Sequence, residues 1–501
     1  MASYLEIILG LAAACLALYY YFIWNFNFWK SRGIPGPKPI PMFGNVLAPM
    51  IGTVSLAQFL TDLYMKYRNE PMIGIFARRT PILIVQDPDI IKDVLIKDFS
   101  KFANRGFMKH EIAEPLSQHL FSLEAERWRP LRTQLSPVFT SGKLKGTFTL
   151  ILDCATHLEK YLNTLVEKGE PIEIRELAAQ YTTDVIGSCA FGIDMNSLSE
   201  KESKFREVGR HIFATNLTAL VKFRIKECLP LLYDLFGYVM TMDKAMTFIK
   251  DVTIDTIEYR KKNNIVRPDF MNTLMELRNH PERVSDIQLT DTILAAQAYV
   301  FFAAGFETSS TTIANTLYEL ALNQDIQDKL REEIREFDAK NNGEWKYEAV
   351  KQMTYLDKVF RETLRKYPPL PFLSREATEN YTFENPKLTV RKHDKVWIPL
   401  FSIHRDPAIY PNPEKFDPER FSEEAVRSRH PMNYIPFGDG PRNCIGARFA
   451  VYQTKIGLIT IIRNFKCDVS EKTEIPFEFD PLAFIMCPKN GLYIKITKID
   501  S

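Results

Sequence analysis

The chain begins with a continuous apolar stretch. Residues 7–24 (IILGLAAACLALYYYFIW) contain no charged side chain. At about 1.5 Å per residue, a helix over this stretch is roughly as long as the hydrocarbon layer of a bilayer is thick. Aromatic side chains typical of a membrane interface cluster at its C-terminal end: Tyr19, Tyr20, Tyr21, Trp24 and Trp29. We therefore predict an N-terminal membrane anchor over residues 1–29.

The charges that flank this stretch predict its orientation. Glu6 precedes it, whereas Lys30 and Arg32 follow it. Because the basic flank of an anchor faces the cytosol, the body of the chain is expected on the cytoplasmic side. A cleaved signal peptide is the alternative, but its basic n-region would be missing and its apolar run would be long. On this topology the sequons at Asn216 and Asn380 remain unglycosylated.

Proline and residue periodicity divide the remaining chain. Four prolines lie between Pro35 and Pro41 and forbid a continuing helix, so residues 30–44 are expected to form a hinge before a body over residues 45–501. Helical periodicity dominates the body, with β-like patches at residues 81–85 and 395–399. The fold class expected is mainly α with a small β region.

The longest helical pattern lies in the middle of the body. No proline occurs from residue 287 to 323, after the N-cap candidates Ser285 and Asp286. The pattern predicts a buried central helix of about 37 residues, or roughly 55 Å. Within it, the Thr308 hydroxyl is placed to donate back to the Ala304 carbonyl near the flexible Gly305, which would bend the helix.

Composition excludes several classes of protein. The chain is 46% hydrophobic and 25% charged with a net charge of +2, so it is globular and no nucleic-acid partner is expected. Its seven cysteines are odd in number and widely spaced, without a CxxC pair. This pattern argues against a zinc or iron–sulfur centre and against a disulfide scaffold.

One cysteine lies in a glycine-rich loop before an apolar helix. Arg442 and the start of the helix favour the thiolate form of Cys444, which is the form that binds metal. Gly438, Gly440 and Gly446 carry no Cβ and allow a flat ligand to approach the backbone closely. A single cysteine is more often a core residue, but this loop favours a ligand role.

These residues form a pattern that resembles a known family. The segment Phe437-x-x-Gly440-x-Arg442-x-Cys444-x-Gly446 resembles the haem-thiolate signature of the cytochrome P-450 monooxygenases. Other segments resemble the family in the same order along the chain: Trp128-x-x-x-Arg132, Glu362-x-x-Arg365 and Arg420 within Pro-Glu-Arg-Phe. The resemblance implies the P-450 fold, with a triangular helical domain around a long central helix and a minor β-sheet domain.

The resemblance also implies a cofactor and the residues that hold it. Haem b would be bound with its iron on the Cys444 thiolate, and Phe437 would pack beside it. The residues implied to neutralise the haem propionates are Trp128, Arg132, Arg375 and Arg442. Structural roles behind the haem are implied for Glu362, Arg365 and Arg420.

A thiolate ligand favours O–O cleavage and hence O₂ activation. The family pattern implies that Thr308 holds a water or hydrogen-bonds the reacting oxygen and that Glu307 feeds protons. Because no flavin or nicotinamide segment is evident, electrons are expected from NADPH through NADPH:cytochrome reductase, with cytochrome b5 as a second candidate donor. Arg127 and Arg129 are candidates for the docking face.

The resemblance is strongest to microsomal insect members that metabolise xenobiotics, which implies the endoplasmic reticulum membrane and small lipophilic substrates such as plant secondary compounds or insecticides. The candidate pocket residues are all apolar: Phe107, Phe121, Phe301, Ala304, Leu370, Phe372 and Phe484. Some of these phenylalanines are equally explained as core packing.

Several other functions remain as alternatives. A hydroxylase of endogenous hormones or fatty acids differs from the first interpretation only in substrate. A haem-thiolate isomerase or dehydratase would not need the Glu307 and Thr308 pair, and a non-catalytic haem-binding membrane protein would not need it either. A zinc or nucleophilic-cysteine enzyme lacks a nearby His or Cys partner for Cys444.

Overall fold

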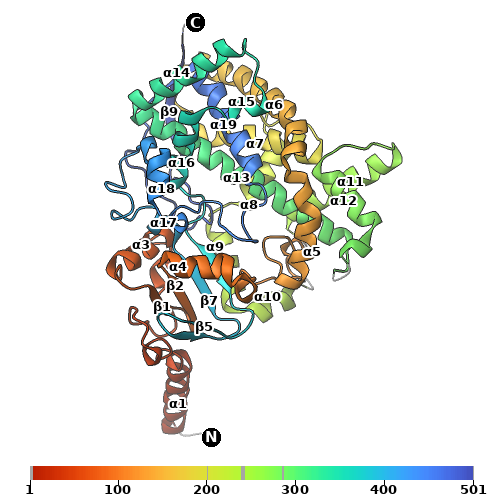
Figure 1. Ribbon diagram of the computed structural model, residues 1–501. Helices are drawn as coiled ribbons and strands as arrows, with labels where there is room; N and C mark the ends of the chain where they lie inside the picture. The colour runs from red at the N-terminus through yellow and green to blue at the C-terminus, as the bar shows by residue number, and fades with distance from the viewer. Residues whose placement is uncertain (1–3, 200, 238–242, 285–286, 500–501) are drawn as a thin grey trace. The chain divides into compact units, whose positions relative to one another are not determined.

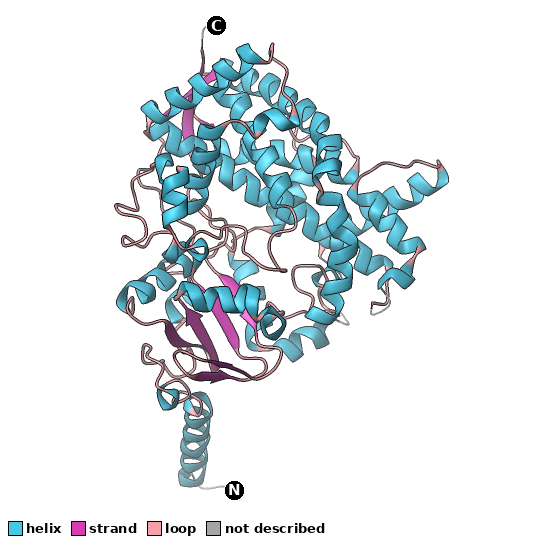
Figure 2. Ribbon diagram, viewed as in Figure 1, coloured by secondary structure: helices cyan, strands magenta, loops and turns pink. Residues whose placement is uncertain are grey.

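The computed structural model describes residues 4–199, 201–237, 243–284 and 287–499. The chain forms two compact units. The first comprises Met1–Gly106, Pro371–His404 and His430–Arg442, and the second comprises Phe107–Leu370, Arg405–Arg429 and Asn443–Ser501. Figure 1 follows the chain by colour, and Figure 2 shows that helix predominates.

The first unit is built on a four-stranded sheet with the order β1-β2-β7-β4. The predicted β patches are confirmed as β2 (Thr80–Val85) and β7 (Lys395–Ile398), which pair in parallel although they are far apart in sequence. The other strands of the first unit are β1 (Met72–Ala77), β4 (Leu373–Glu376), β5 (Tyr381–Phe383) and β6 (Leu388–Val390). Its α-helices after the predicted anchor are α2 (Leu47–Ile51), α3 (Leu56–Lys66), α4 (Pro88–Lys92) and α17 (Leu400–Ile403). Helix α3 buries Leu60 and Leu63 against the strand residues Ile73, Ile75 and Ile82, because its apolar positions share one face.

The predicted anchor forms α1 (Tyr4–Ile23), which is long and apolar enough to cross a membrane. None of its side chains is buried in the protein, and Trp24 beyond its end is 82% exposed. The prediction that Trp29 belongs to the interfacial aromatic group is wrong. Its indole is 3% exposed and donates through Nε1 to the Ile75 carbonyl at 2.9 Å. The indole is buried there because Gly74 has no Cβ in its path.

The second unit is mainly helical. Its helices are α5 (Ala125–Leu135), α6 (Ser141–Glu167), α7 (Ile174–Ile186), α8 (Lys204–Ile212), α9 (Leu217–Cys228), α10 (Pro230–Gly237), α11 (Lys244–Lys262), α12 (Phe270–Asn279), α13 (Asp291–Leu322), α14 (Gln324–Lys340), α15 (Tyr347–Val350), α16 (Thr354–Lys366), α18 (Glu423–Ser428) and α19 (Ala447–Asn464). A small sheet has the order β3-β9-β8, with strands β3 (Ile172–Glu173), β8 (Phe465–Asp468) and β9 (Tyr493–Lys498).

The predicted central helix is α13, which packs against α7, α11 and α19 in this unit (Figure 1). It has 32 residues and begins at Asp291, four residues later than predicted. The N-cap is Thr290, whose hydroxyl accepts from the Ile293 N–H, so it satisfies one of the free donors of the first turn. The N-cap candidates Ser285 and Asp286 lie outside the described residues.

The packing of the Trp29 ring against Gly74 can be tested with Gly74→Ala. A Cβ at residue 74 would lie 2.2 Å from the indole Cγ, so the variant should lose about 1–3 kcal/mol of unfolding free energy from overpacking. Thermal and urea unfolding of the full chain in detergent measure this loss. Gly146→Ala is the control, because a Cβ there meets nothing within 4 Å and should stabilise the exposed helix by about 0.5–1 kcal/mol. Equal effects of the two substitutions would contradict the packing described.

Candidate active site

The sequence around Cys444 is held by a side chain from α5. Arg132 donates through Nη1 to the Asn443 carbonyl at 3.0 Å and through Nη2 to Asn443 Oδ1 at 2.9 Å. Cys444 itself is exposed and lies three residues before α19. Burial lowers the pKa of Arg132, while Cys444 nearby acts in the opposite direction. Trp128, one helical turn before Arg132, is buried at 3% exposure, so α5 contributes both residues from neighbouring turns.

The first unit contains the residues that precede Cys444 in the loop. Arg442 is 2% exposed and donates through Nε to the Ala103 carbonyl at 2.8 Å, while Arg105 donates to the Arg442 carbonyl at 2.9 Å. Gly440 has φ of 71°, and a Cβ there would lie 1.9 Å from the Leu95 carbonyl oxygen. Only glycine fits this position. Phe437 is half-buried in the same unit.

Arg375 is a buried cation on β4. It is 2% exposed, and its Nη1 donates to the Ser374 carbonyl at 2.8 Å. Its Nε–H has no hydrogen-bond partner, and burial lowers the pKa of Arg375 to about 10. A buried guanidinium with an unused donor is suited to an anionic group such as a carboxylate.

In the middle of α13, Ala304 and Thr308 are accessible to solvent. Most of the helix is buried, but Ala304 is exposed and Thr308 is half-buried. The Thr308 hydroxyl donates to the Ala304 carbonyl at 2.9 Å, which is the hydrogen bond that the sequence predicted. The next carbonyl, that of Gly305, accepts from Gln453 Nε2 of α19 at 2.7 Å. At this point two successive helix carbonyls, those of Ala304 and Gly305, therefore accept hydrogen bonds from side chains.

Glu307 lies on a different face of α13 from Thr308. It is 2% exposed and forms an ion pair with Arg175 on α7. Burial acts to lower the pKa of Arg175, but the Glu307 carboxylate outweighs this effect and the pKa is raised. Sequence reasoning missed Arg175, because nothing in the local sequence relates it to a helix more than 100 residues later.

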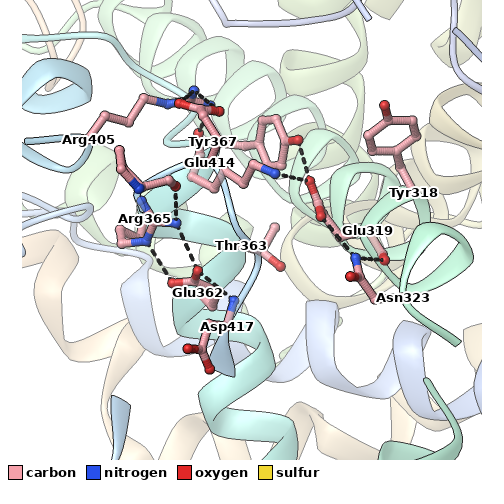
Figure 3. Close-up of polar contacts among 12 residues, drawn as sticks. Tyr318, Glu319, Asn323, Glu362, Thr363, Arg365, Tyr367, Arg405, Glu414 and Asp417 are labelled. Carbon is pink, nitrogen blue, oxygen red and sulfur yellow. Dashed lines mark hydrogen bonds and ion pairs between the residues drawn. The ribbon is translucent and has the colours of Figure 1, made fainter. Parts of the chain in front are cut away.

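A buried ion-pair cluster lies at the C-terminal half of α16 (Figure 3). Glu362 and Arg365 are both fully buried and make two contacts, Nε to Oε2 at 2.7 Å and Nη2 to Oε1 at 2.8 Å. Arg420 Nε approaches Glu362 Oε1 at 3.5 Å, the Asp417 N–H donates to Glu362 Oε1 at 2.9 Å, and Arg365 donates to the Pro413 carbonyl at 2.7 Å. The cluster thus fastens residues 411–420 to α16.

The candidate pocket residues have different surroundings. Phe107 and Phe121 stack with ring centroids 5.2 Å apart. Phe301 is buried and stacks on Phe270 at 3.9 Å. In the second unit Leu370 is half-buried and Phe484 is 53% exposed, and in the first unit Phe372 contacts the Trp397 ring at 4.5 Å.

Of the two basic residues considered for docking, Arg127 is engaged within its own unit. It forms ion pairs with Glu111 at 2.8 Å and with Glu124, and it donates to Gln118 Oε1 at 3.1 Å. Arg129 is exposed. Only Arg129 therefore presents its charge mainly to solvent.

Glu362→Gln tests how much the stability of the second unit depends on the buried Glu362 carboxylate. The substitution removes the carboxylate that pairs directly with Arg365 and Arg420, so the unfolding free energy should fall by about 3–5 kcal/mol. Urea unfolding followed by circular dichroism measures it. Glu336→Gln on the exposed face of α14 is the control, with an expected change within about 0.5 kcal/mol. A loss at Glu362 no larger than the control would contradict this account.

Comparison with known proteins gives one consistent result. Residues 34–496 match the family model of cytochrome P450. The chain is 42% identical to probable cytochrome P450 6a14 of Drosophila melanogaster over 98% of both chains. It is 42% identical to cytochrome P450 6A1 of Musca domestica over 99% of this chain and 98% of the relative, and 39% identical to cytochrome P450 6k1 of Blattella germanica over 97% and 96%. The mainly helical architecture with small sheets agrees with this match. The chain therefore belongs to the cytochrome P450 family of haem-thiolate monooxygenases.

Proposed function

We propose that this cytochrome P450 inserts one oxygen atom of O₂ into lipophilic xenobiotics such as plant secondary compounds or insecticides. The similarity to insect cytochrome P450 relatives supports this proposal. The observation that carries the assignment of the site is the Cys444 thiol, which lies exposed in a glycine-rich loop that Arg132 holds through Asn443.

The residues present suit a haem with two propionates. Cys444 would supply the thiolate that holds the haem iron, and Phe437 would pack beside the haem. In the first unit Arg375, which has an unused buried donor, and Arg442 would serve the propionates; in the second unit Trp128 and Arg132 would do so. When bound, the haem supplies the thiolate-ligated iron that activates O₂. The protein's part is to hold the Cys444 loop in place, which Arg132 does through Asn443, and the positive charge of Arg132 favours the thiolate form of a nearby cysteine.

Proton delivery is assigned to two neighbouring residues of α13. The Thr308 hydroxyl already donates to the Ala304 carbonyl, so its oxygen keeps lone pairs to accept a hydrogen bond from a water. The Glu307 carboxylate is the proposed entry point for protons, and its ion pair with Arg175 keeps it in place. The proton is proposed to pass from Glu307 to Thr308 through intervening water, because the two side chains lie on different faces of α13.

Substrate would contact the stacked pair Phe107 and Phe121, Ala304 on α13, and Leu370 and Phe484. Exposed or half-buried apolar groups of this kind suit planar lipophilic molecules. Phe301 and Phe372 are assigned less direct roles, since Phe301 is buried and stacks on Phe270 and Phe372 packs against Trp397.

The site of action is proposed to be the endoplasmic reticulum membrane, with α1 as the single anchor and the remaining chain on the cytoplasmic side. NADPH:cytochrome reductase is the proposed electron donor and cytochrome b5 a second donor. Arg129 rather than Arg127 is proposed to meet the acidic partner, because Arg127 already pairs with two carboxylates.

The central assignment is tested by the carbon monoxide difference spectrum of the dithionite-reduced protein in membranes. The wild-type chain should give the strongly red-shifted Soret band of a thiolate-ligated haem. Cys444→Ser should abolish this band, because an alcohol is a much poorer ligand than a thiolate. Cys228→Ser, at a half-buried cysteine of α9, is the matched control and should retain it. A red-shifted band that survives Cys444→Ser would refute the assignment.

The role of Thr308 is tested in the enzyme reconstituted with reductase. Thr308→Ala should lower the product formed per NADPH by about tenfold or more and divert reducing equivalents to hydrogen peroxide, because proton delivery is lost. Thr308→Ser keeps the hydroxyl and should retain most of the coupling. Unchanged coupling in Thr308→Ala would argue against the role, and an unaltered carbon monoxide spectrum would show that haem binding is intact.

A further inference from the structure

Near the C-terminal end of α13, a second buried carboxylate binds the end of α16. Glu319 is 1% exposed. Its Oε1 accepts from Lys366 Nζ at 2.8 Å and from the Tyr367 hydroxyl, and Oε2 lies 3.4 Å from Asn323 Nδ2 (Figure 3). Asn323 also donates to the Glu319 carbonyl at 2.8 Å. Glu319 thus joins the last turn of α13 to the residues that end α16.

Tyr367 is fixed by this carboxylate and in turn supports a distant segment. Burial and the Glu319 charge raise the pKa of Tyr367 well above its usual value, so its hydroxyl stays protonated and donates. Its ring stacks on Phe477 with centroids 5.6 Å apart and tilts against Phe479 at 6.4 Å. Tyr318, beside Glu319, contacts the other side of the same cluster, with its centroid 5.1 Å from that of Phe477.

These aromatic residues form the base of a hairpin-like segment, residues 478–489, which we call the C-terminal loop. Its two sides are paired by a bridge between Phe479 and Pro488, and the Asp480 N–H donates to the Cys487 carbonyl at 2.9 Å. Phe484 lies near its tip and is 53% exposed. The position of the loop therefore depends on how its base lies on Tyr367.

Two further contacts relate the C-terminal loop to the site. The Met486 N–H donates to the Pro369 carbonyl at 2.9 Å, directly before the pocket candidate Leu370. Cys487 lies within electrostatic range of Arg175 and Glu307, and burial raises the pKa of its thiol to about 11. The same side of the loop, at Met486 and Cys487, thus reaches both a residue next to those assigned to substrate and the residues assigned to proton delivery.

We infer that Glu319 is a positioning residue for substrate: through the Tyr367 hydroxyl it sets where the C-terminal loop lies, and hence where Phe484 and Leu370 meet a bound molecule. The contacts of Glu319 are with Lys366, Tyr367 and Asn323, so it is assigned to positioning and not to binding. The inference rests on the proposed function only for the identity of what is bound. The contacts that hold the C-terminal loop do not depend on the proposed function.

Tyr367→Phe is the sharpest variant, because it removes the hydroxyl and keeps the ring that stacks on Phe477. Loss of a hydrogen bond to a charged group should speed amide hydrogen exchange in residues 478–489 roughly tenfold in the full chain in detergent. Tyr259→Phe is the control, because Tyr259 is 62% exposed on α11 and should leave exchange unchanged. Glu319→Gln should act in the same direction as Tyr367→Phe.

Ligand binding supplies the second measurement. Imidazole probes the iron alone, whereas 4-phenylimidazole adds an apolar ring that must fit the pocket, and both give Soret shifts. Tyr367→Phe should weaken 4-phenylimidazole about threefold to tenfold, in line with a few contacts displaced, and should leave imidazole affinity and the carbon monoxide spectrum as in the wild type.

Unchanged exchange in the C-terminal loop would overturn the inference. Equal weakening of the two ligands would also overturn it, since a general loss of fold or haem affects both. A wild-type protein that gives neither a thiolate spectrum nor an imidazole shift would instead refute the proposed function, while the exchange comparison would still decide whether Tyr367 holds the loop.

Discussion

A buried carboxylate in the helical unit needs a cation or other donors, and these come from another segment of the chain. Glu307, Glu319 and Glu362 are each no more than 2% exposed. A buried charge without a partner is costly, so each of these residues fixes a specific pair of elements: Glu307 joins α13 to α7, Glu319 joins α13 to the end of α16, and Glu362 joins α16 to residues 411–420. Hydrophobic packing alone would permit small shifts between these elements, whereas charge pairing selects one arrangement.

The pairs lie where precise placement matters for chemistry. The Glu307 pair is adjacent to Thr308, the residue assigned to proton delivery. The Glu319 cluster supports the C-terminal loop and its exposed Phe484. Arg132 plays a similar part for Cys444, because it bonds both the backbone and the side chain of Asn443. Arg132 acts on Cys444 through Asn443, whereas Glu319 acts on Phe484 through Tyr367 and the base of the C-terminal loop.

Much of this site was visible in the sequence because its signals are local. The Trp128 and Arg132 spacing, the Glu362 and Arg365 spacing and the glycines around Cys444 all lie within single turns or loops. The Thr308 to Ala304 hydrogen bond follows from the i to i−4 geometry of any helix. The start of α13 was misplaced by four residues because Thr290 competes with earlier capping residues as the N-cap, and capping signals alone rank such candidates poorly.

Pairings between distant segments could not be read in the same way. Nothing in the sequence relates Arg175 to Glu307, Tyr367 to Phe477 or Trp29 to Gly74, because each pair forms only when separate elements pack. The amphipathic side chain of Trp29 predicted a position at the membrane interface. The residue is buried in the protein instead, because Gly74 has no Cβ in the way of the indole ring. Local residue order was enough to predict the family and the helical class and to single out Cys444 as the candidate ligand. The tertiary structure alone decided which buried charges meet and which aromatic rings face solvent, because those depend on the distance between segments that the chain does not encode locally.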